Sequence, residues 1–334
     1  MRRVSDNIIL VTGGAGYVGS HVCKALADTG VTPVVYDNLS RGHSWAVRFG
    51  PFERGDIADR QRLDEVLVRY RPAAVLHFAA LADVAESLKR PELYYNNNVA
   101  GTLTLLDAMV AAGVGTIVFS STCAVYGTPS RLPVQEDLPL APVSPYGWSK
   151  RFVEQILVDY SAAHGLAYAS LRYFNAAGAA PEAGIGEDHS PERHLIPLAL
   201  DVAAGFRPSI GVFGEDYATP DGTCIRDYTH VLDLADAHIR ALGHLRAGRS
   251  NLTLNLGNGV GYSVREVIDA VEHVTGRRVT RVSRARRPGD PPVLIADSSR
   301  ARALLGWVPA RSTIEAQVED AWRWHRIHSP RAVA

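Results

Sequence analysis

The stretch Val11-Thr12-Gly13-Gly14-Ala15-Gly16-Tyr17-Val18-Gly19 decides the fold of this 334-residue chain. It follows an apolar run at residues 8–12, which has the length of a buried strand, and leads into an amphipathic stretch at residues 20–29. Its glycines satisfy both G-x-G-x-x-G and G-x-x-G-x-x-G spacing. Such glycines make a tight turn and let the backbone approach a pyrophosphate at the amide-rich start of a helix. The stretch therefore predicts a strand, turn and helix that bind a dinucleotide.

Strands and helices alternate along the first half of the chain. Apolar runs predict strands at residues 8–12, 32–36, 74–78, 116–120 and 167–173. Apolar residues with helical spacing predict helices between them, at residues 20–29, 60–70, 92–112 and 146–164. Strands that are apolar throughout are typical of parallel sheets with helices on both faces. We therefore predict an α/β fold with a doubly wound parallel sheet of the Rossmann type.

The second half predicts a smaller lobe. Residues 176–189 are rich in Gly, Ala and Pro and lack a period, which is typical of a loop that leaves the sheet. Shorter elements follow, with helices expected at residues 195–204, 263–275, 299–305 and 313–328 and a strand at residues 252–256. We expect a cofactor-binding domain over residues 1–175 and a substrate-binding α+β lobe over residues 176–334, with a chain that crosses between the two. A ligand at the carboxyl edge of the sheet would lie between these lobes.

The composition excludes several classes of protein. Apolar residues make up 46% of the chain, and 35 Lys and Arg balance 35 Asp and Glu. This excludes a disordered chain and a strongly nucleic-acid-binding one. The three cysteines are widely spaced, so they predict neither a disulfide framework nor a zinc site, and we expect no metal. The apolar run at residues 8–12 is too short for a membrane span or a secretory signal, so we expect a cytoplasmic protein.

Asp37 favours NAD over NADP. It ends the predicted second strand, where a carboxylate can bind both ribose hydroxyls of an adenosine and would repel a 2′-phosphate. Arg41 keeps the alternative open, because a nearby arginine can accommodate that phosphate. Asp56-Ile57, after the expected third strand, could hold the adenine by the same logic, although acidic residues are common in such loops.

A second motif carries the candidate catalytic pair. In Ser144-Pro145-Tyr146-Gly147-Trp148-Ser149-Lys150, the spacing of four places Tyr146 and Lys150 on one face of a helix. A free phenol has a pKa near ~10 and is a poor base. We expect the ammonium and a positive nicotinamide to lower that pKa, which suits a general base for an alcohol. Thr122 or Ser120, at the end of the fourth long strand, could share the substrate proton.

The ordered series of motifs resembles the UDP-glucose 4-epimerase family of the extended short-chain dehydrogenase/reductase superfamily. The resemblance runs from residue 11 to about residue 325 and rests on far more than one motif. Besides the glycine loop and the Tyr-Lys pair, the matching segments are residues 37–38, 56–57, 77–80, 86–87, 95–98, 120–122, 172–175, 214–217, 221–223, 226–228, 233–234 and 287–290.

The resemblance implies roles for individual residues. Those matching the cofactor site are Gly13, Gly16, Tyr17, Val18, Gly19, Asp37, Asn38, Asp56, Ile57, Phe78, Ala79, Ala80, Asn97, Ser120, Tyr146, Lys150 and Tyr173. Those matching the substrate site are Thr122, Tyr146, Asn175, His194, Leu195, Phe213, Arg226, Arg287, Asp290 and Leu294. The implied catalytic residues are Tyr146, Lys150 and Thr122.

The resemblance also implies a reaction. Tyr146 takes the proton of the sugar's 4-hydroxyl while a hydride passes to NAD, the 4-keto sugar turns over, and the hydride returns to its other face. The substrate is a UDP-sugar, expected to be UDP-glucose or UDP-galactose. Family members are commonly homodimers joined through two helices, here residues 92–112 and 146–164.

Other readings of the same residues stay open. Ala82 and Thr122 replace a lysine and a serine that are common in the family, and they also resemble UDP-xylose/UDP-arabinose 4-epimerases. Leu294 is intermediate between an aromatic residue and a small one, so we expect weak activity on UDP-N-acetylglucosamine. Cys123 and Ala124 stand where dehydratases carry acidic residues, which disfavours a dehydratase. A non-catalytic nucleotide sensor would not need the Tyr-Lys pair.

Overall fold

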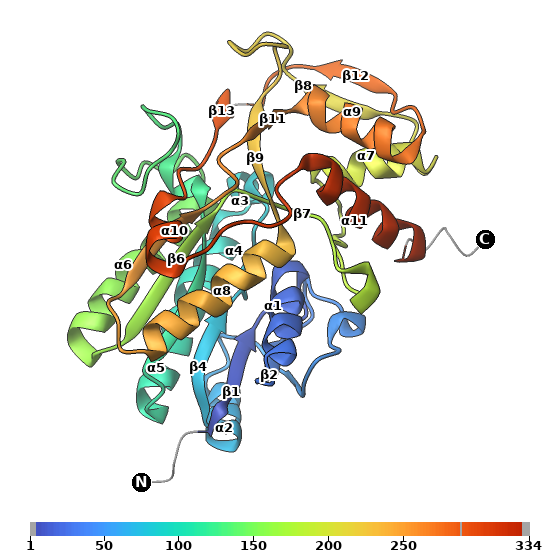
Figure 1. Ribbon diagram of the computed structural model, residues 1–334. Helices are drawn as coiled ribbons and strands as arrows, with labels where there is room; N and C mark the ends of the chain where they lie inside the picture. Colours follow the sequence, from blue (N-terminus) through green and yellow to red (C-terminus); the bar gives the residue numbers. More distant parts are fainter. Residues whose placement is uncertain (1–4, 288, 329–334) are drawn as a thin grey trace.

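Seven parallel strands form a large twisted sheet in the computed structural model, which describes residues 5–287 and 289–328 (Figure 1). The strand order is β10-β6-β5-β4-β1-β2-β3, and every pairing is parallel. The strands are β1 (Ser5–Thr12), β2 (Thr32–Asp37), β3 (Phe52–Arg54), β4 (Pro72–His77), β5 (Thr116–Thr122), β6 (Ala167–Tyr173) and β10 (Leu252–Leu256). The predicted doubly wound α/β fold is confirmed.

Helices cover both faces of this sheet because successive side chains of each strand point to opposite sides. In β1, Ile9 and Val11 enter one core and Leu10 enters the other. The first core is covered by α1 (Tyr17–Asp28), α8 (Val231–Arg246) and α10 (Ser299–Leu305). The second core is covered by α2 (Arg60–Tyr70), α5 (Gly101–Ala112) and α6 (Pro145–His164). Among the described residues, no helix has the length and apolar content to cross a membrane.

Two helical regions differ from the prediction. The single helix expected at residues 92–112 consists of α4 (Pro91–Tyr94), the π-helix η2 (Tyr95–Ala100) and α5. Helix α8 was not predicted, because polar residues interrupt its apolar face. Among them, buried Asp233 accepts hydrogen bonds from the backbone N–H groups of Ala310 and Arg311, partners that are distant in the sequence.

The smaller lobe lies at one end of the large sheet (Figure 1). Its core is formed mainly by α7 (Leu195–Ala203), α9 (Val264–Thr275) and α11 (Ile314–His328). Its strands are β7 (Asn175–Ala177), β8 (Ile210–Phe213), β9 (Ile225–His230), β11 (Gly261–Ser263), β12 (Arg281–Arg284) and β13 (Val293–Leu294). The remaining short elements are α3 (Val84–Lys89), η1 (Ser44–Ala46), η3 (Cys123–Tyr126) and η4 (Pro181–Ala183).

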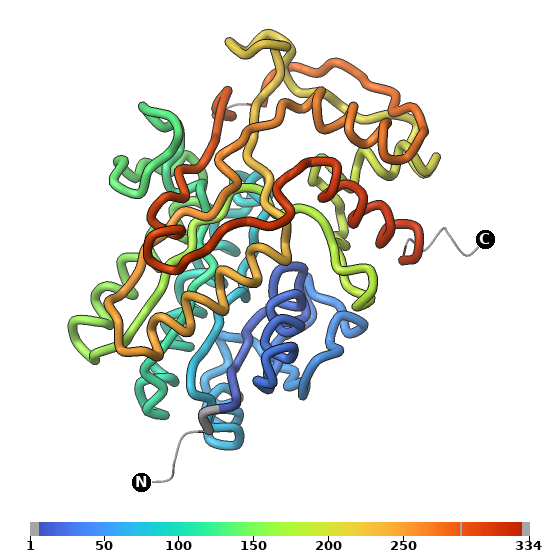
Figure 2. Tube along the Cα trace, viewed as in Figure 1, coloured from blue at the N-terminus to red at the C-terminus, as the bar shows by residue number. Residues whose placement is uncertain are grey.

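The chain passes more than once between the two parts. Figure 2 shows α8 and β10 beside the large sheet, whereas the segments before and after them lie in the smaller lobe. Strand β10 pairs with β6 and completes the edge of the large sheet. The division at residue 175 with a crossing chain stays a prediction, and α8, β10 and α10 are elements of the second half that lie with the first.

A buried ion pair fixes α6 against the sheet. Glu154 on α6 accepts two hydrogen bonds from the Arg172 guanidinium on β6, at 2.8 and 2.7 Å. The Ser121 hydroxyl on β5 also donates to Glu154, at 2.6 Å. Both charged side chains are 5% exposed, and the Tyr126 hydroxyl accepts a further Arg172 N–H at 2.8 Å. The pair therefore holds one face of α6 on the ends of two strands.

Replacing Glu154 with alanine tests this support. The substitution leaves the Arg172 charge buried without its counter-ion, so we expect it to lower the free energy of unfolding by about 3–5 kcal/mol. Asp236→Ala is the matched control, because it removes a half-exposed pair with Arg240 within one helix and should cost about 0.5 kcal/mol or less. Urea unfolding measures both effects. Equal losses in the two variants would contradict the assigned role of the buried pair.

Candidate active site

The glycine turn packs tightly against the residues after β4. Gly13 has a φ of +72°, and a Cβ there would lie 2.4 Å from the backbone nitrogen of Ala79. A Cβ at Gly19 would lie 2.2 Å from the Gly13 carbonyl oxygen. Gly16 is the N-cap of α1, and no side chain of the described residues caps this helix. Backbone amides at the start of α1 are thus left for an anionic group, which fits the pyrophosphate of a dinucleotide.

Asp37 lies beside this turn at the end of β2. Its carboxylate accepts hydrogen bonds from the backbone N–H groups of Ala15 at 3.0 Å and Leu39 at 2.8 Å. Burial raises the pKa of this carboxyl, and the two backbone hydrogen bonds oppose the rise. Arg41 turns instead to Glu86, with which it forms two hydrogen bonds of 2.8 and 2.9 Å. This pairing compensates the Arg41 charge and favours NAD over a 2′-phosphorylated cofactor.

The loop after β3 approaches the end of β2. The Asn38 side-chain amide donates to the Asp56 carboxylate at 2.8 Å. Asp56 also accepts the backbone N–H of Ala58 at 2.9 Å, which fixes the turn into α2. Ile57 is buried in the second core. These three predicted cofactor residues therefore lie together at one edge of the sheet, and their contact with an adenine stays a prediction.

Two residues of the first turn of α1 have different surroundings. The Tyr17 hydroxyl donates to the Gly178 carbonyl oxygen at 2.6 Å, so it joins α1 to the loop that leads into the smaller lobe. Val18 is half-buried and packs against the first core. Tyr17 thus links α1 to that loop and Val18 packs against the sheet, while the role of both in cofactor binding stays a prediction.

The segment after β4 forms the other wall of the glycine turn. The Phe78 N–H donates to the Thr12 carbonyl oxygen at 2.8 Å, and Ala79 and Ala80 follow, half-buried. Asn97, in η2, donates its side-chain amide to the Asn98 side chain at 2.9 Å. The structure thus places these four predicted cofactor residues on segments that come from β4 and from the π-helix.

Lys150 is almost completely buried at the end of β5. Its Nζ donates to the Ser120 carbonyl oxygen at 2.8 Å and lies 4.8 Å from the centre of the Phe119 ring. The Ser120 hydroxyl and the Tyr173 hydroxyl are 2.7 Å apart. Burial lowers the pKa of Lys150 to about 7, although the Glu154 charge favours the ammonium. The Lys150 ammonium therefore loses its proton more readily than an exposed lysine, because few protein groups stabilise its charge.

Tyr146 lies one turn before Lys150 on α6. Burial raises the pKa of Tyr146 above its usual value, Tyr173 adds to the rise, and a hydrogen bond with Thr122 opposes it. The sequence predicts a lowered Tyr146 pKa, but in the chain without its cofactor this pKa is raised. The physical reason is the lost hydration of the buried phenolate. A positive charge brought by a bound cofactor would have to overcome it.

The predicted substrate residues of the smaller lobe form two groups. Arg226 pairs with Asp290, and the Arg287 guanidinium lies 4.1 Å from the centre of the Phe213 ring. Phe213 is 37% exposed, so this stacked pair borders solvent. Asn175 and Leu294 lie on the two strands that pair with β9, where Leu294 is opposite Arg226. Asn175 donates its side-chain amide to the Asp227 carbonyl oxygen at 2.9 Å, and Leu294 is buried in a small cluster with Tyr126 and Phe174.

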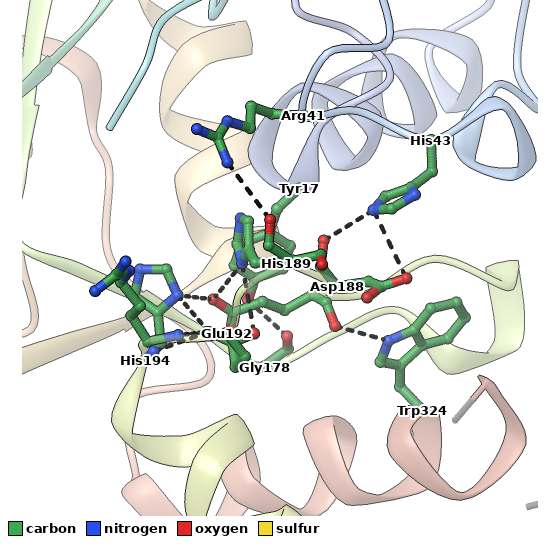
Figure 3. Close-up of polar contacts among 12 residues, drawn as sticks. Tyr17, Arg41, His43, Gly178, Asp188, His189, Glu192, His194 and Trp324 are labelled. Carbon is green, nitrogen blue, oxygen red and sulfur yellow. Dashed lines mark hydrogen bonds and ion pairs between the residues drawn. The ribbon is translucent and has the colours of Figure 1, made fainter. Parts of the chain in front are cut away.

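His194 and Leu195 lie at the start of α7. The His194 imidazole is surrounded by carboxylates, with its Nδ1 2.8 Å from Glu187 and 2.9 Å from Glu192 (Figure 3). Burial opposes a charged imidazole, but these two carboxylates outweigh it and hold the pKa of His194 well above its usual value. One nitrogen of His194 is thus engaged within the protein, and its contact with a substrate stays a prediction.

Comparison with known proteins identifies the family. The model of the NAD dependent epimerase/dehydratase family matches residues 9–257. A UDP-glucose 4-epimerase of Rhizobium meliloti (strain 1021) is 54% identical over 322 residues, which cover 96% of this chain and 98% of that protein. The chain belongs to the NAD dependent epimerase/dehydratase family.

Solved structures of relatives agree with this assignment. The UDP-glucose 4-epimerase from Brucella ovis in complex with NAD has 51% identity and a TM-score of 0.93, covering 95% of this chain and 97% of that one. The one from Stenotrophomonas maltophila, with bound NAD and formylated UDP-arabinopyranose, has 44% identity and a TM-score of 0.93, covering 97% and 99%. The epimerase/dehydratase fold therefore extends over almost the whole of this chain.

Several residues that shape this epimerase/dehydratase site were given no individual role from the sequence, although Asn98 lies in the matching segment 95–98. Asn98 is buried in η2, where its side chain bonds to the backbone of Leu81 and to the Ser149 hydroxyl at 2.9 Å. Glu154 sets the position of α6, as described above. The run of three asparagines at residues 96–98 was a visible signal, since amides in a helix favour irregular turns. Glu154 gave no such signal, because a glutamate is common on any helix.

The buried Lys150 gives the stability of the NAD-free chain a specific pH dependence. The folded chain releases this proton near pH 7, whereas an unfolded lysine keeps it up to about pH 10.4. Between these values the unfolded state binds more protons, so this lysine destabilises the fold less as the pH rises. Lys150→Met removes the effect. Its stability advantage over the wild-type chain should shrink by about 2 kcal/mol between about pH 6.5 and pH 9.

Urea unfolding of the NAD-free wild-type and Lys150→Met chains at the two pH values measures this difference. Lys89→Met is the control, because Lys89 is exposed and its loss should have the same effect at both pH values. A constant advantage of Lys150→Met would show that Lys150 is not destabilised by its surroundings.

Proposed function

We propose that this chain is an NAD-dependent UDP-glucose 4-epimerase, which interconverts UDP-glucose and UDP-galactose through a transient 4-keto sugar. The observation that carries the proposal is the group that half-buried Tyr146 forms with buried Lys150 and Thr122 at the carboxyl end of β5. Identity of 54% to a UDP-glucose 4-epimerase over nearly the full length supports it.

The residues that would hold NAD lie along one edge of the large sheet. The amides at the start of α1 would bind the pyrophosphate, and Asp37 would bind the adenosine ribose through lone pairs that its two backbone hydrogen bonds leave free. Lys150 uses one of its three donors on Ser120, so two remain for the nicotinamide ribose. When bound, NAD would supply the hydride acceptor and donor for carbon 4.

The protein's own contribution is proton transfer and position. Tyr146 would take the proton of the 4-hydroxyl and return it after the sugar has turned over. The Thr122 side chain hydrogen-bonds Tyr146 and also accepts the Ala124 N–H at 3.1 Å, so it would orient the phenol and share the proton. The Lys150 ammonium would favour the phenolate by its charge.

The nucleotide part of the substrate would be held by the smaller lobe. Arg226 and Arg287 suit a diphosphate, because a guanidinium can pair with phosphate oxygens in two places. Asp290 would bind the uridine ribose, and Phe213 would line the uracil site, where the stacked Arg287 already lies. Asn175, His194 and Leu195 would contact the phosphates. Firm anchoring of the nucleotide leaves the sugar free to turn.

A pentose is the second candidate substrate. The related structure from Stenotrophomonas maltophila contains formylated UDP-arabinopyranose, which is a UDP-pentose derivative. Ala82 and Thr122 fit this alternative, because they resemble the residues of UDP-xylose/UDP-arabinose 4-epimerases. Buried Leu294 would restrict the space for a 2-substituent, which disfavours UDP-N-acetylglucosamine. Burial also raises the pKa of Cys123 to about 12, so this thiol is a poor replacement for the acidic residues of a dehydratase.

The assembly and location belong to the same proposal. A homodimer through η2, α5 and α6 is supported by exposed aromatic residues on these helices. Tyr95, Trp148 and Phe152 are 36%, 39% and 42% exposed and contact one another through the Phe152 ring. A cytoplasmic location is supported by Cys23, Cys123 and Cys224, which are free thiols in the described part of the chain.

The direct test is an assay without added cofactor. We expect the purified chain to convert UDP-galactose to UDP-glucose, and its denaturation to release NAD. UDP-xylose and UDP-N-acetylglucosamine are assayed in parallel. Exclusive conversion of UDP-xylose would replace the hexose with the pentose as the substrate, whereas no conversion of any UDP-sugar would contradict the proposal.

Two substitutions separate catalysis from cofactor retention. Tyr146→Phe removes the proton acceptor and should slow epimerisation by about 10² to 10⁴-fold while NAD stays bound. Asp37→Ala should instead release NAD during dialysis, because the ribose loses its carboxylate partner. Turnover and the NAD content of the dialysed protein are measured for both variants. A fully active Tyr146→Phe enzyme would refute the assignment of the base.

A further inference from the structure

The segment Glu187-Asp188-His189-Ser190-Pro191-Glu192-Arg193-His194 brings four potential metal ligands together. Its pattern is Glu-x-His-x-x-Glu-x-His, and the loop before α7 folds so that the four side chains come together. Figure 3 shows His189, Glu192 and His194 of this group side by side. One ligand atom from each of Glu187, His189, Glu192 and His194 lies within 4.8 Å of the other three. The sequence did not predict this group, because its two carboxylates and two imidazoles have no familiar metal spacing.

The distances within the group suit a small divalent ion. The Nδ1 atom of His194 lies 2.8 Å from Glu187 and 2.9 Å from Glu192. The Nδ1 atom of His189 lies 3.4 and 3.6 Å from the same two carboxylates. Ligands placed tetrahedrally at about 2.0–2.2 Å from a zinc ion are separated by about 3.3–3.6 Å. The two His194 separations are shorter than this range, and the two His189 separations lie within it. An ion could therefore enter after small side-chain shifts.

The charge and surroundings of the group also suit a cation. The Glu187 and Glu192 side chains are only 9% and 15% exposed, so two negative charges are held largely away from water. One divalent cation, or two protons on the imidazoles, would neutralise them. The Nδ1 atom of His189 is buried and contacts both carboxylates at 3.4 and 3.6 Å, but it makes no hydrogen bond of good geometry within the described residues. This nitrogen therefore has a bonding capacity that the protein leaves unused and that a metal ion could satisfy.

The group is held in place by contacts outside it. The Trp324 indole N–H on α11 donates to the Glu187 carbonyl oxygen at 3.2 Å. The Tyr17 ring on α1 meets the His189 ring edge to face, with centres 6.3 Å apart (Figure 3). Glu192 accepts the N–H of His194 at 2.8 Å, which fixes its carboxylate at the start of α7. Such outer contacts orient side chains before a metal binds.

We propose that Glu187, His189, Glu192 and His194 form a structural site for one zinc-like divalent ion. Two imidazoles and two carboxylates favour zinc over magnesium or calcium, which prefer oxygen ligands alone. Four protein ligands leave no open position, so the ion would not act on a substrate. It would fasten the loop that enters the smaller lobe to α7, and thereby fix the position of Leu195. His194 is also a predicted substrate residue, so the site adjoins the proposed substrate site, but its metal content can be measured separately from epimerase activity.

Metal content tests the site directly. The untagged chain is dialysed against zinc chloride, passed through a desalting column and analysed by elemental mass spectrometry. We expect one zinc per chain in the wild type and a midpoint of thermal unfolding that rises by several degrees with zinc but not with magnesium. His189→Ala should lose both the retained zinc and the thermal shift. His273→Ala, which removes an exposed imidazole on α9, should keep both.

A second variant guards against a general loss of structure in His189→Ala. Cysteine is also a zinc ligand, so His189→Cys should recover zinc retention relative to His189→Ala. Wild-type chain without retained zinc, or equal zinc in His189→Ala and His273→Ala, would overturn the proposal. If the wild-type chain retains no zinc after this treatment but still epimerises its substrate, the proposed metal site is wrong and the proposed function stands. Loss of epimerisation in a chain that keeps its zinc would do the opposite.

Discussion

The burial of one ammonium group constrains the rest of the candidate site. Lys150 is 3% exposed, and burial lowers its pKa to about 7, so the fold holds a charge where water cannot support it. The Ser120 carbonyl oxygen and the nearby Glu154 charge are its compensation within the chain. Glu154 in turn depends on Arg172 and Ser121. A site that is costly without its ligand is well suited to retain that ligand, because ribose hydroxyls would satisfy the unused donors.

Specific hydrogen bonds also link the two parts of the molecule. The loop after β7 is tied to α1 through Tyr17 and Gly178, and to α11 through Trp324 and Glu187. These specific hydrogen bonds join the cofactor side and the substrate side in addition to the apolar core that α8, β10 and α10 share with the large sheet. Such a connection would keep the residues proposed to bind the nucleotide in place while the sugar part of the substrate turns.

The local pattern of the sequence predicted the large sheet well and the smaller lobe poorly. Strands such as Ala167–Tyr173 and helices such as Arg60–Tyr70 are buried on regular faces, so their periodicity is visible. Helix α8 was missed because Asp233 satisfies the backbone of residues 310 and 311, which no local pattern reveals. The π-helix contains Asn98, whose partners come from two other segments and are not visible in the local sequence. Short strands such as β13 depend on pairing with β9.

The candidate site likewise combines residues that local spacing predicts with residues that only the folded chain brings together. The glycine turn, Asp37 and the Tyr146–Lys150 pair were predicted from spacing, and the structure places them along one edge of the sheet. The direction of the Tyr146 pKa was wrong for the chain alone, because the extent of burial is invisible in the sequence. The convergence of Glu187, His189, Glu192 and His194 was missed, since the fold of a loop without a period determines it.

The central claim is that the hydrogen on carbon 4 is removed and returned inside the protein, with Tyr146 moving only the hydroxyl proton. Incubating the chain with UDP-galactose that carries deuterium at carbon 4, in ordinary water and without added NAD, tests it most directly. The account predicts UDP-glucose that retains the deuterium at carbon 4. Replacement of that deuterium by hydrogen from the solvent would contradict it.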